Sequence, residues 1–341
     1  MDNKINQDKS NYLDISLLSN ITQDSYTCFF NNTFIVFKTI DNYYYLLYTT
    51  KDYSIICLDL YNQKKITEIK GIKKERICCF RHYFVKNIKK DLVLTISSMN
   101  NNLRIWDVKN WKCFLYINKV YNEGVLYSVC LLNDKNNYYL VTSNCNYFGD
   151  SELIKIYDLK GNKIKEINDS NDPTLLIDIF YNKKNLKKYI VTGNKNYLKS
   201  FEYDKNILYH KYYECYNGAH FSFLIDDKKE IIKLIDSCED GNIRIWNFDT
   251  GILLNKIKIS KYSLYGICFL NDNYLLVGCQ DNVIKVLDLS NNNILKTLSD
   301  HNNYVMTIIR INHIHYGECL LSHGFENDQI KLWTIKNINN E

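Results

Sequence analysis

A short motif that recurs at a nearly constant interval is the feature that most constrains how this chain can fold. Each copy has a polar turn, an apolar-x-apolar segment, and then an aromatic residue or leucine that is usually followed by an acid. The seven copies are 41 to 51 residues apart and end at Leu58, Trp106, Tyr157, Phe201, Trp246, Leu287 and Trp333. Such a period predicts an array of similar structural units.

Each unit is predicted to contain four β-strands, named a, b, c and d in chain order. A second pattern, an apolar strand closed by an Asn turn, precedes the first and occurs at Tyr26–Asn32, Tyr127–Asp134 and Tyr265–Asp272. In the sixth unit the strands are expected at about Leu264–Leu270, Tyr274–Gly278, Val283–Leu289 and Ile294–Leu298. The c segments alternate clearly, which predicts that each sheet packs between two neighbours.

With the Trp106-Asp107 dipeptide, its six degenerate copies and this period, the chain resembles the WD40-repeat family from about Tyr12 to Ile335. The resemblance implies an all-β fold, a seven-bladed β-propeller of four-stranded antiparallel blades. We expect the propeller at residues 12–336, a disordered N-terminal tail at 1–11 and a C-terminal tail at 337–341. The last unit lacks a d strand. We therefore expect the alternating segment Tyr12–Leu18 to complete the last blade, because an open sheet edge favours aggregation.

The resemblance also implies a structural hydrogen-bond network of His, Ser or Thr, Asp and Trp inside a blade. In the fifth blade it corresponds to His220, Ser237, Asp240 and Trp246. In the seventh blade it corresponds to His301, Ser322, Asn327 and Trp333, with Asn327 in place of the acid. The other five blades lack the histidine and are expected to depend on packing alone.

The chain shows no sign of catalytic chemistry. It contains no GxxxxGK[ST], GxSxG, HExxH or CxxC motif, and its seven histidines are dispersed. We therefore expect no enzyme activity, metal, cofactor or small-molecule substrate. The net charge of +5 is too small to indicate nucleic acid by itself. No segment approaches 18 consecutive apolar residues, so we expect a soluble protein of the cytoplasm, the nucleus or both.

Function in a propeller is expected in its loops, because the sheets are used for packing. The d–a and b–c turns emerge on one face, here called the top face, and the a–b and c–d turns emerge on the bottom face. The top turns are rich in acids and contain several aromatic residues, a composition that suits a basic or aromatic-rich peptide. The candidate partner-binding residues are Tyr121, Tyr147, Phe148, Asp150, Tyr216, Phe325 and Glu326. The leading hypothesis is a non-enzymatic interaction scaffold, a monomeric subunit of a larger complex.

Two alternatives remain open. The bottom a–b turns contain Lys86, Lys89, Lys90, Lys183, Lys184, Lys187 and Lys188, and they could bind phospholipid or RNA. The family resemblance also suggests a substrate receptor of a ubiquitin ligase, in which an acid followed two residues later by Arg or Lys docks the ligase adaptor. Asp107-Val108-Lys109 and Asp158-Leu159-Lys160 match that pattern in part.

Overall fold

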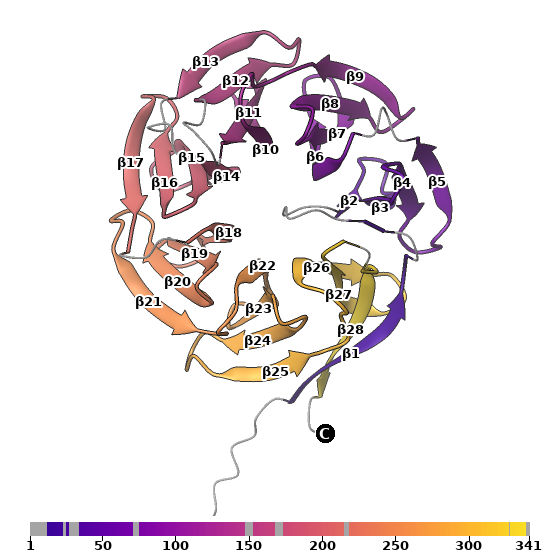
Figure 1. Cartoon of the computed structure of the whole chain (residues 1–341), viewed down its shortest axis with the longest axis vertical. Coiled ribbons are helices and arrows are strands. Elements are labelled where there is room, and N and C mark those ends of the chain that lie inside the picture. Colours follow the sequence, from indigo (N-terminus) through magenta and orange to yellow (C-terminus); the bar gives the residue numbers. More distant parts are fainter. Residues whose placement is uncertain are drawn as a thin grey trace, which may run out of the picture.

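The chain forms a ring of seven β-sheets around a central axis (Figure 1). The computed structural model describes residues 12–22, 25–26, 34–70, 75–146, 153–167, 173–214, 218–326 and 328–338. Within these ranges there are 28 strands, and every sheet is a blade of four antiparallel strands. The predicted seven-bladed β-propeller is therefore confirmed.

The first six blades each use four consecutive strands, a to d. Blade 1 consists of β2 (Phe34–Lys38), β3 (Tyr44–Thr49), β4 (Ile55–Asp59) and β5 (Lys65–Ile69). Blade 2 consists of β6 (Ile77–Val85), β7 (Lys90–Ser97), β8 (Asn102–Asp107) and β9 (Lys112–Ile117). Blade 3 consists of β10 (Val125–Asp134), β11 (Asn137–Cys145), β12 (Ile154–Asp158) and β13 (Lys163–Ile167). Blade 4 consists of β14 (Thr174–Asn182), β15 (Lys187–Asn194), β16 (Leu198–Glu202) and β17 (Ile207–Tyr212). Blade 5 consists of β18 (His220–Asp226), β19 (Lys233–Cys238), β20 (Asn242–Asn247) and β21 (Leu253–Lys258). Blade 6 consists of β22 (Leu264–Phe269), β23 (Tyr274–Cys279), β24 (Ile284–Asp288) and β25 (Ile294–Leu298).

The seventh blade joins two distant parts of the chain. It contains β26 (Val305–His313), β27 (Gly317–Gly324), β28 (Lys331–Ile338) and, as its outer strand, β1 (Tyr12–Asn20). Figure 1 shows β1, in indigo, along the outside of this yellow blade, and the ladder runs from Tyr12 opposite Ile338 to Asn20 opposite Lys331. The predicted closure by an N-terminal strand is thus confirmed. Strand β28 reaches two residues past the expected end of the propeller at 336, and residues 1–11 lie outside the described ranges.

The core lies between blades rather than in one central mass. Trp106 of blade 2 packs with Leu47 and Cys57 of blade 1, and Trp333 of blade 7 packs with Leu276 of blade 6. The c strand β8 is buried along its whole length, whereas the outer strand β9 is mostly exposed. Burying a large apolar side chain stabilises the fold by roughly 2–3 kcal/mol, so each motif aromatic contributes mainly by joining its blade to the preceding one.

The expected first strand of blade 1 was misplaced. The expectation put it at Tyr26–Asn32, but the a strand is β2, which begins at Phe34, and its turn to β3 contains Asn42 with φ 66°. Two neighbouring apolar segments compete here, and the later one supplies Phe34 and Phe37 to the core. Residues 27–33 lie outside the described ranges. In blade 6, by contrast, each strand end falls within one residue of its expected position.

Candidate interaction site on the top face

Four aromatic rings form a continuous row across blades 5, 6 and 7. The ring centroids of Phe221 and Tyr265 are 4.8 Å apart, and those of Tyr265 and Tyr304 are 6.2 Å apart in a stacked arrangement. Tyr304 and Phe325 stack in turn at 6.0 Å. We call these four residues the aromatic row. It links three blades into one surface, although the residues are far apart in the sequence.

The row lies on the top face because of where its members stand on their strands. Phe221 and Tyr265 are the second residues of the a strands β18 and β22, and Tyr304 immediately precedes β26. Phe325 follows β27, and its N–H donates to the carbonyl oxygen of Tyr304 at 2.8 Å. Tyr265 is buried while the other three rings are half-buried. The row therefore offers ring surface to a partner without needing a change in the fold.

Two exposed acids accompany the aromatic row. Glu326 follows Phe325 in the turn, with φ 56°, and Glu239 lies in the b–c turn of blade 5. Burial, together with the nearby Tyr304 and the charge of Glu239, raises the pKa of Tyr265 to about 12, so its hydroxyl stays protonated. Aromatic faces next to carboxylates favour a cationic side chain. The chemistry of this surface therefore suits lysine or arginine rather than an anion.

A buried hydrogen-bond chain supports the blade 7 part of the row. The indole N–H of Trp333 donates to Ser322 Oγ at 2.7 Å, and His301 Nε2 lies 2.7 Å from the same oxygen. His301 Nδ1 is 2.6 Å from the Asp328 carboxylate. The expected positions of His301, Ser322 and Trp333 in one network are therefore correct. The network contains an acid after all, Asp328, next to the position at which Asn327 was expected to replace it. Asn327 itself lies outside the described residues.

Blade 5 uses a different acid from the expected one. Asp236 bridges the network, with one carboxylate oxygen 2.6 Å from His220 Nδ1 and the other accepting from the Trp246 indole at 2.6 Å. Ser237 points to the other side of the strand and donates to the carbonyl of Tyr265 in blade 6. The expected roles of Ser237 and Asp240 in this network are therefore wrong. Ser237 is adjacent to Asp236 on β19 and so faces the opposite side of the sheet, and Asp240 lies in the turn after that strand.

Asp240 instead forms an ion pair with Arg244. Burial alone would raise the pKa of Asp240, but hydrogen bonds from Arg244 and Asn242 lower it to about 2. The distances from Arg244 to its two oxygens are 3.1 and 2.5 Å. In the same turn Gly241 has φ 76°, and a Cβ there would lie 2.1 Å from the carbonyl oxygen of Ser260. The ion pair of Asp240 and the conformation of Gly241 thus fix the turn of blade 5. Glu239 lies on the exposed side of this turn.

Only part of the expected partner-binding set lies on this surface. Phe325 and Glu326 belong to it, whereas Phe221, Tyr265 and Tyr304 were missed because they belong to inner strands or their edges. Tyr121 does not belong to this surface, because the residue is 1% exposed and its hydroxyl donates to the carbonyl of Thr142 at 2.8 Å. Tyr147, Phe148, Asp150 and Tyr216 lie outside the described residues.

The lysines of the bottom a–b turns are mostly engaged with neighbouring groups. Lys183 pairs with Asp227 of blade 5 at 3.4 Å, and Lys188 pairs with Asp134 of blade 3. Lys90 and Lys187 pair with acids of their own blades, and Lys184 donates to the backbone carbonyls of Lys229 and Glu230. Within the described ranges, Lys86 and Lys89 have no ion pair. The bottom face thus presents much less unpaired charge than its composition indicates.

Comparison with known proteins assigns no family to the chain. A scan of protein-family models found no match, and a search of curated proteins also found none. In the described part of the chain, no group of three or more His, Cys, Asp or Glu side chains is placed to hold a metal ion. The same part contains no helix of the length and hydrophobicity needed to cross a membrane.

Proposed function

We propose that this protein is a non-enzymatic scaffold of the WD40-repeat type that binds a basic peptide segment of a partner across the aromatic row. The observation that carries the proposal is the row itself, four contiguous rings from three blades with Glu239 and Glu326 beside it. The repeated motif and the two His-to-Trp networks support the WD40 assignment. The protein acts in the cytoplasm or nucleus as one subunit of a larger complex.

The architecture gives the proposal a physical basis. A rigid surface loses little conformational entropy on binding, and half-buried rings already have fixed orientations. A lysine or arginine side chain can lie on the ring of Phe325 while its charge approaches Glu326, an arrangement worth about 1–2 kcal/mol. Several such contacts along the row are needed for micromolar affinity. The partner segment is therefore expected to carry basic residues at more than one position.

The two alternatives have weaker support in the side-chain contacts. Binding of phospholipid or RNA by the bottom face would require unpaired lysines, and most of those lysines are engaged. Docking of a ligase adaptor at Asp107-Val108-Lys109 would require an available Asp107. Asp107 is 6% exposed as a residue, and its carboxylate pairs with Lys90 at 2.5 Å and accepts the backbone N–H of Lys109. Neither surface presents as many exposed groups that favour the same kind of ligand as the aromatic row does.

Selection of peptides from a displayed random library tests the proposal. We expect selected peptides to be enriched in lysine and arginine, and a variant carrying Phe325→Ala and Glu326→Gln to bind them about tenfold more weakly. The matched control carries Lys86→Glu and Lys89→Glu on the bottom face and should bind as the parent does. Equal affinity of the top-face variant, at an unchanged melting temperature, would refute the site.

A further inference from the structure

Six of the seven blades carry a cation at the same place in the c strand. The position lies two residues before the end of the repeated motif and is occupied by Arg104, Lys155, Lys199, Arg244, Lys285 and Lys331. Five of these side chains belong to residues that are at most 8% exposed, which is unusual for charged groups. The equivalent residue in blade 1 is Ile56. The repeat thus has one exception, and it lies at the junction between the last and first blades.

In four of these blades the cation binds the chain segment that leads into its own blade. Arg104 forms an ion pair with Glu75, Lys155 Nζ donates to the carbonyl of Val120 at 3.1 Å, and Lys285 Nζ donates to that of Ile259 at 3.0 Å. In blade 5, Arg244 Nε donates to Glu214 at 2.7 Å. In blades 2, 3, 5 and 6 the cation therefore binds an acid or a backbone carbonyl of the segment that leads into the blade, whereas Lys331 of blade 7 donates to Asn20 of the outer strand β1.

Blade 1 has the acid that blades 5 and 6 carry four residues before the cation, but it lacks the cation. Asp52 stands four residues before Ile56, as Asp240 stands four residues before Arg244. The turns share their geometry, because the N–H of Ser54 donates to Asp52 Oδ1 at 3.3 Å and that of Asn242 donates to Asp240 Oδ1 at 3.1 Å. In blade 1 the hydroxyls of Thr50 and Ser54 also donate to the carboxylate, and the Thr50 bond holds the pKa of Asp52 below its ordinary value. Asp52 thus shares the turn hydrogen bond of Asp240, but it is exposed and pairs with no arginine in the described part of the chain.

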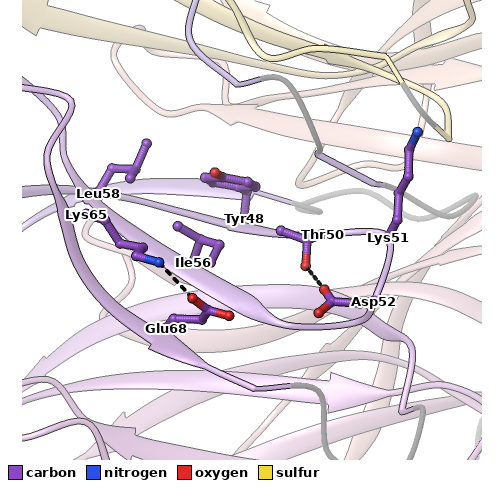
Figure 2. A pocket seen from close by; sticks show the side chains of 8 residues that line it. All are labelled: Tyr48, Thr50, Lys51, Asp52, Ile56, Leu58, Lys65 and Glu68. Atoms are coloured by element: carbon purple, nitrogen blue, oxygen red, sulfur yellow. Dashed lines mark hydrogen bonds and ion pairs between the residues drawn. The ribbon is translucent and has the colours of Figure 1, made fainter.

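A pocket of about 360 Å³ lies beside Ile56, the residue that stands where the other blades have the cation (Figure 2). Ile56 pairs across the sheet with Tyr48 on one side and Glu68 on the other, so a cation entering there lies near an aromatic ring and two carboxylates. Glu68 pairs with Lys65 at 2.7 Å, and Figure 2 shows Lys51 directed away from Asp52. By contrast, the space around Arg104 at the junction of blades 1 and 2 measures about 10 Å³.

No basic residue of the adjoining segment is available to take the vacant place. Residues 21–33, which lead from β1 into blade 1, contain no lysine or arginine in their sequence. We propose that this pocket receives an arginine or lysine side chain from a partner protein, bound between Asp52 and Glu68 over Ile56. The partner's cation thereby completes in trans the arrangement that blades 2, 3, 5 and 6 contain within the chain. The site is separate from the aromatic row, so each can fail without the other.

Methyl NMR with small probes tests the proposal on the whole chain. Isoleucine and leucine methyl groups are labelled, and Ile56 and Leu58 report on the pocket while Ile284 in blade 6 serves as the control. Acetyl-arginine amide and acetyl-lysine amide should shift the two reporters in a saturable way. Acetyl-citrulline amide, which is neutral and nearly isosteric with the arginine probe, should not. An equal response to citrulline, or no response to arginine, would overturn the proposal.

Two variants separate specific binding from general attraction of a cation. Asp52→Asn retains the turn's hydrogen-bond acceptor but removes the charge, and should weaken arginine binding about tenfold. Ile56→Arg supplies the cation within the chain and should abolish the response of Leu58 while raising the melting temperature. If both variants bind the arginine probe as tightly as the parent protein does, the proposal is overturned. A lower melting temperature for Ile56→Arg would also count against it, because it would show that the pocket does not accept the side chain.

Discussion

The two faces of the propeller use charged residues in different ways. On the bottom face, a–b turns of neighbouring blades are joined directly, as by Lys183 to Asp227, Lys228 to Asp272 and Asn87 to the backbone of Asn136. On the top face, c-strand cations bind the chain segments that connect one blade to the next, and exposed acids such as Glu326 remain on the surface. The number of charged residues on a face therefore does not tell how many are available to a partner. That number depends on how many of them are paired within the chain.

The largest expected effect comes from removing what both faces share, the closed ring. Deletion of residues 1–20 removes β1 and leaves β28 paired only with β27, with its outer edge open. The cooperative melting transition should be lost and the protein should aggregate, because an open sheet edge is exposed. Differential scanning calorimetry and size-exclusion chromatography measure this. Deletion of residues 1–11 alone, which spares β1, is the control, and an unchanged melting temperature in the longer deletion would contradict the closure model.

A smaller effect is expected from Ser322→Ala beneath the top face. The change leaves both the Trp333 indole N–H and His301 Nε2 without their buried partner, and should cost about 2–4 kcal/mol of unfolding free energy. Thr95→Ala in blade 2 removes one acceptor, that of the Trp106 indole, and should cost about half as much. Denaturant unfolding compares the two variants. Equal costs would show that the histidine adds no support to the aromatic row.

The smallest effect concerns the ion pairs of the bottom face. Lys188 and Asp134 are partly buried, so a double-mutant cycle with Lys188→Met and Asp134→Asn should give a coupling of about 0.5–1 kcal/mol. Glu326→Gln on the top face should change stability by less than about 0.5 kcal/mol. If the Lys188–Asp134 coupling is absent in low salt, the bottom pairs do not join the blades and the contrast between the faces is lost.

The period of the motif predicted seven similar four-stranded units, and the resemblance to the WD40-repeat family implied that these units form a propeller. Closure by Tyr12–Leu18 could be predicted for the same reason, since the last unit visibly lacks a strand. The error in blade 1 arose where two apolar segments, one at Tyr26–Asn32 and one beginning at Phe34, compete for one strand position. Periodicity cannot choose between them, because the choice depends on which segment fits against the neighbouring blades.

The candidate site was much less accessible to sequence reasoning. Phe325 and Glu326 stand in a turn, so they could be predicted to reach a surface. Phe221 and Tyr265 are strand residues that a pattern assigns to the core, and only the ring geometry shows that they extend the row. The acids of the two networks were misassigned for a similar reason. Asp236 and Ser237 are neighbours in sequence, and one residue decides which side of the sheet each one faces.

The closure of blade 7 also has a consequence for synthesis. Ser16 and Thr334, whose hydroxyls lie 3.2 Å apart, are separated by 318 positions, so β1 leaves the ribosome long before its neighbour exists. Until then the nascent chain carries a solitary strand and an incomplete ring, the kind of species that chaperones bind. A circular permutant that joins Ile338 to Tyr12 through a short hairpin and opens the chain between blades would make every blade local in sequence. It should fold faster than the natural order, with the same final structure.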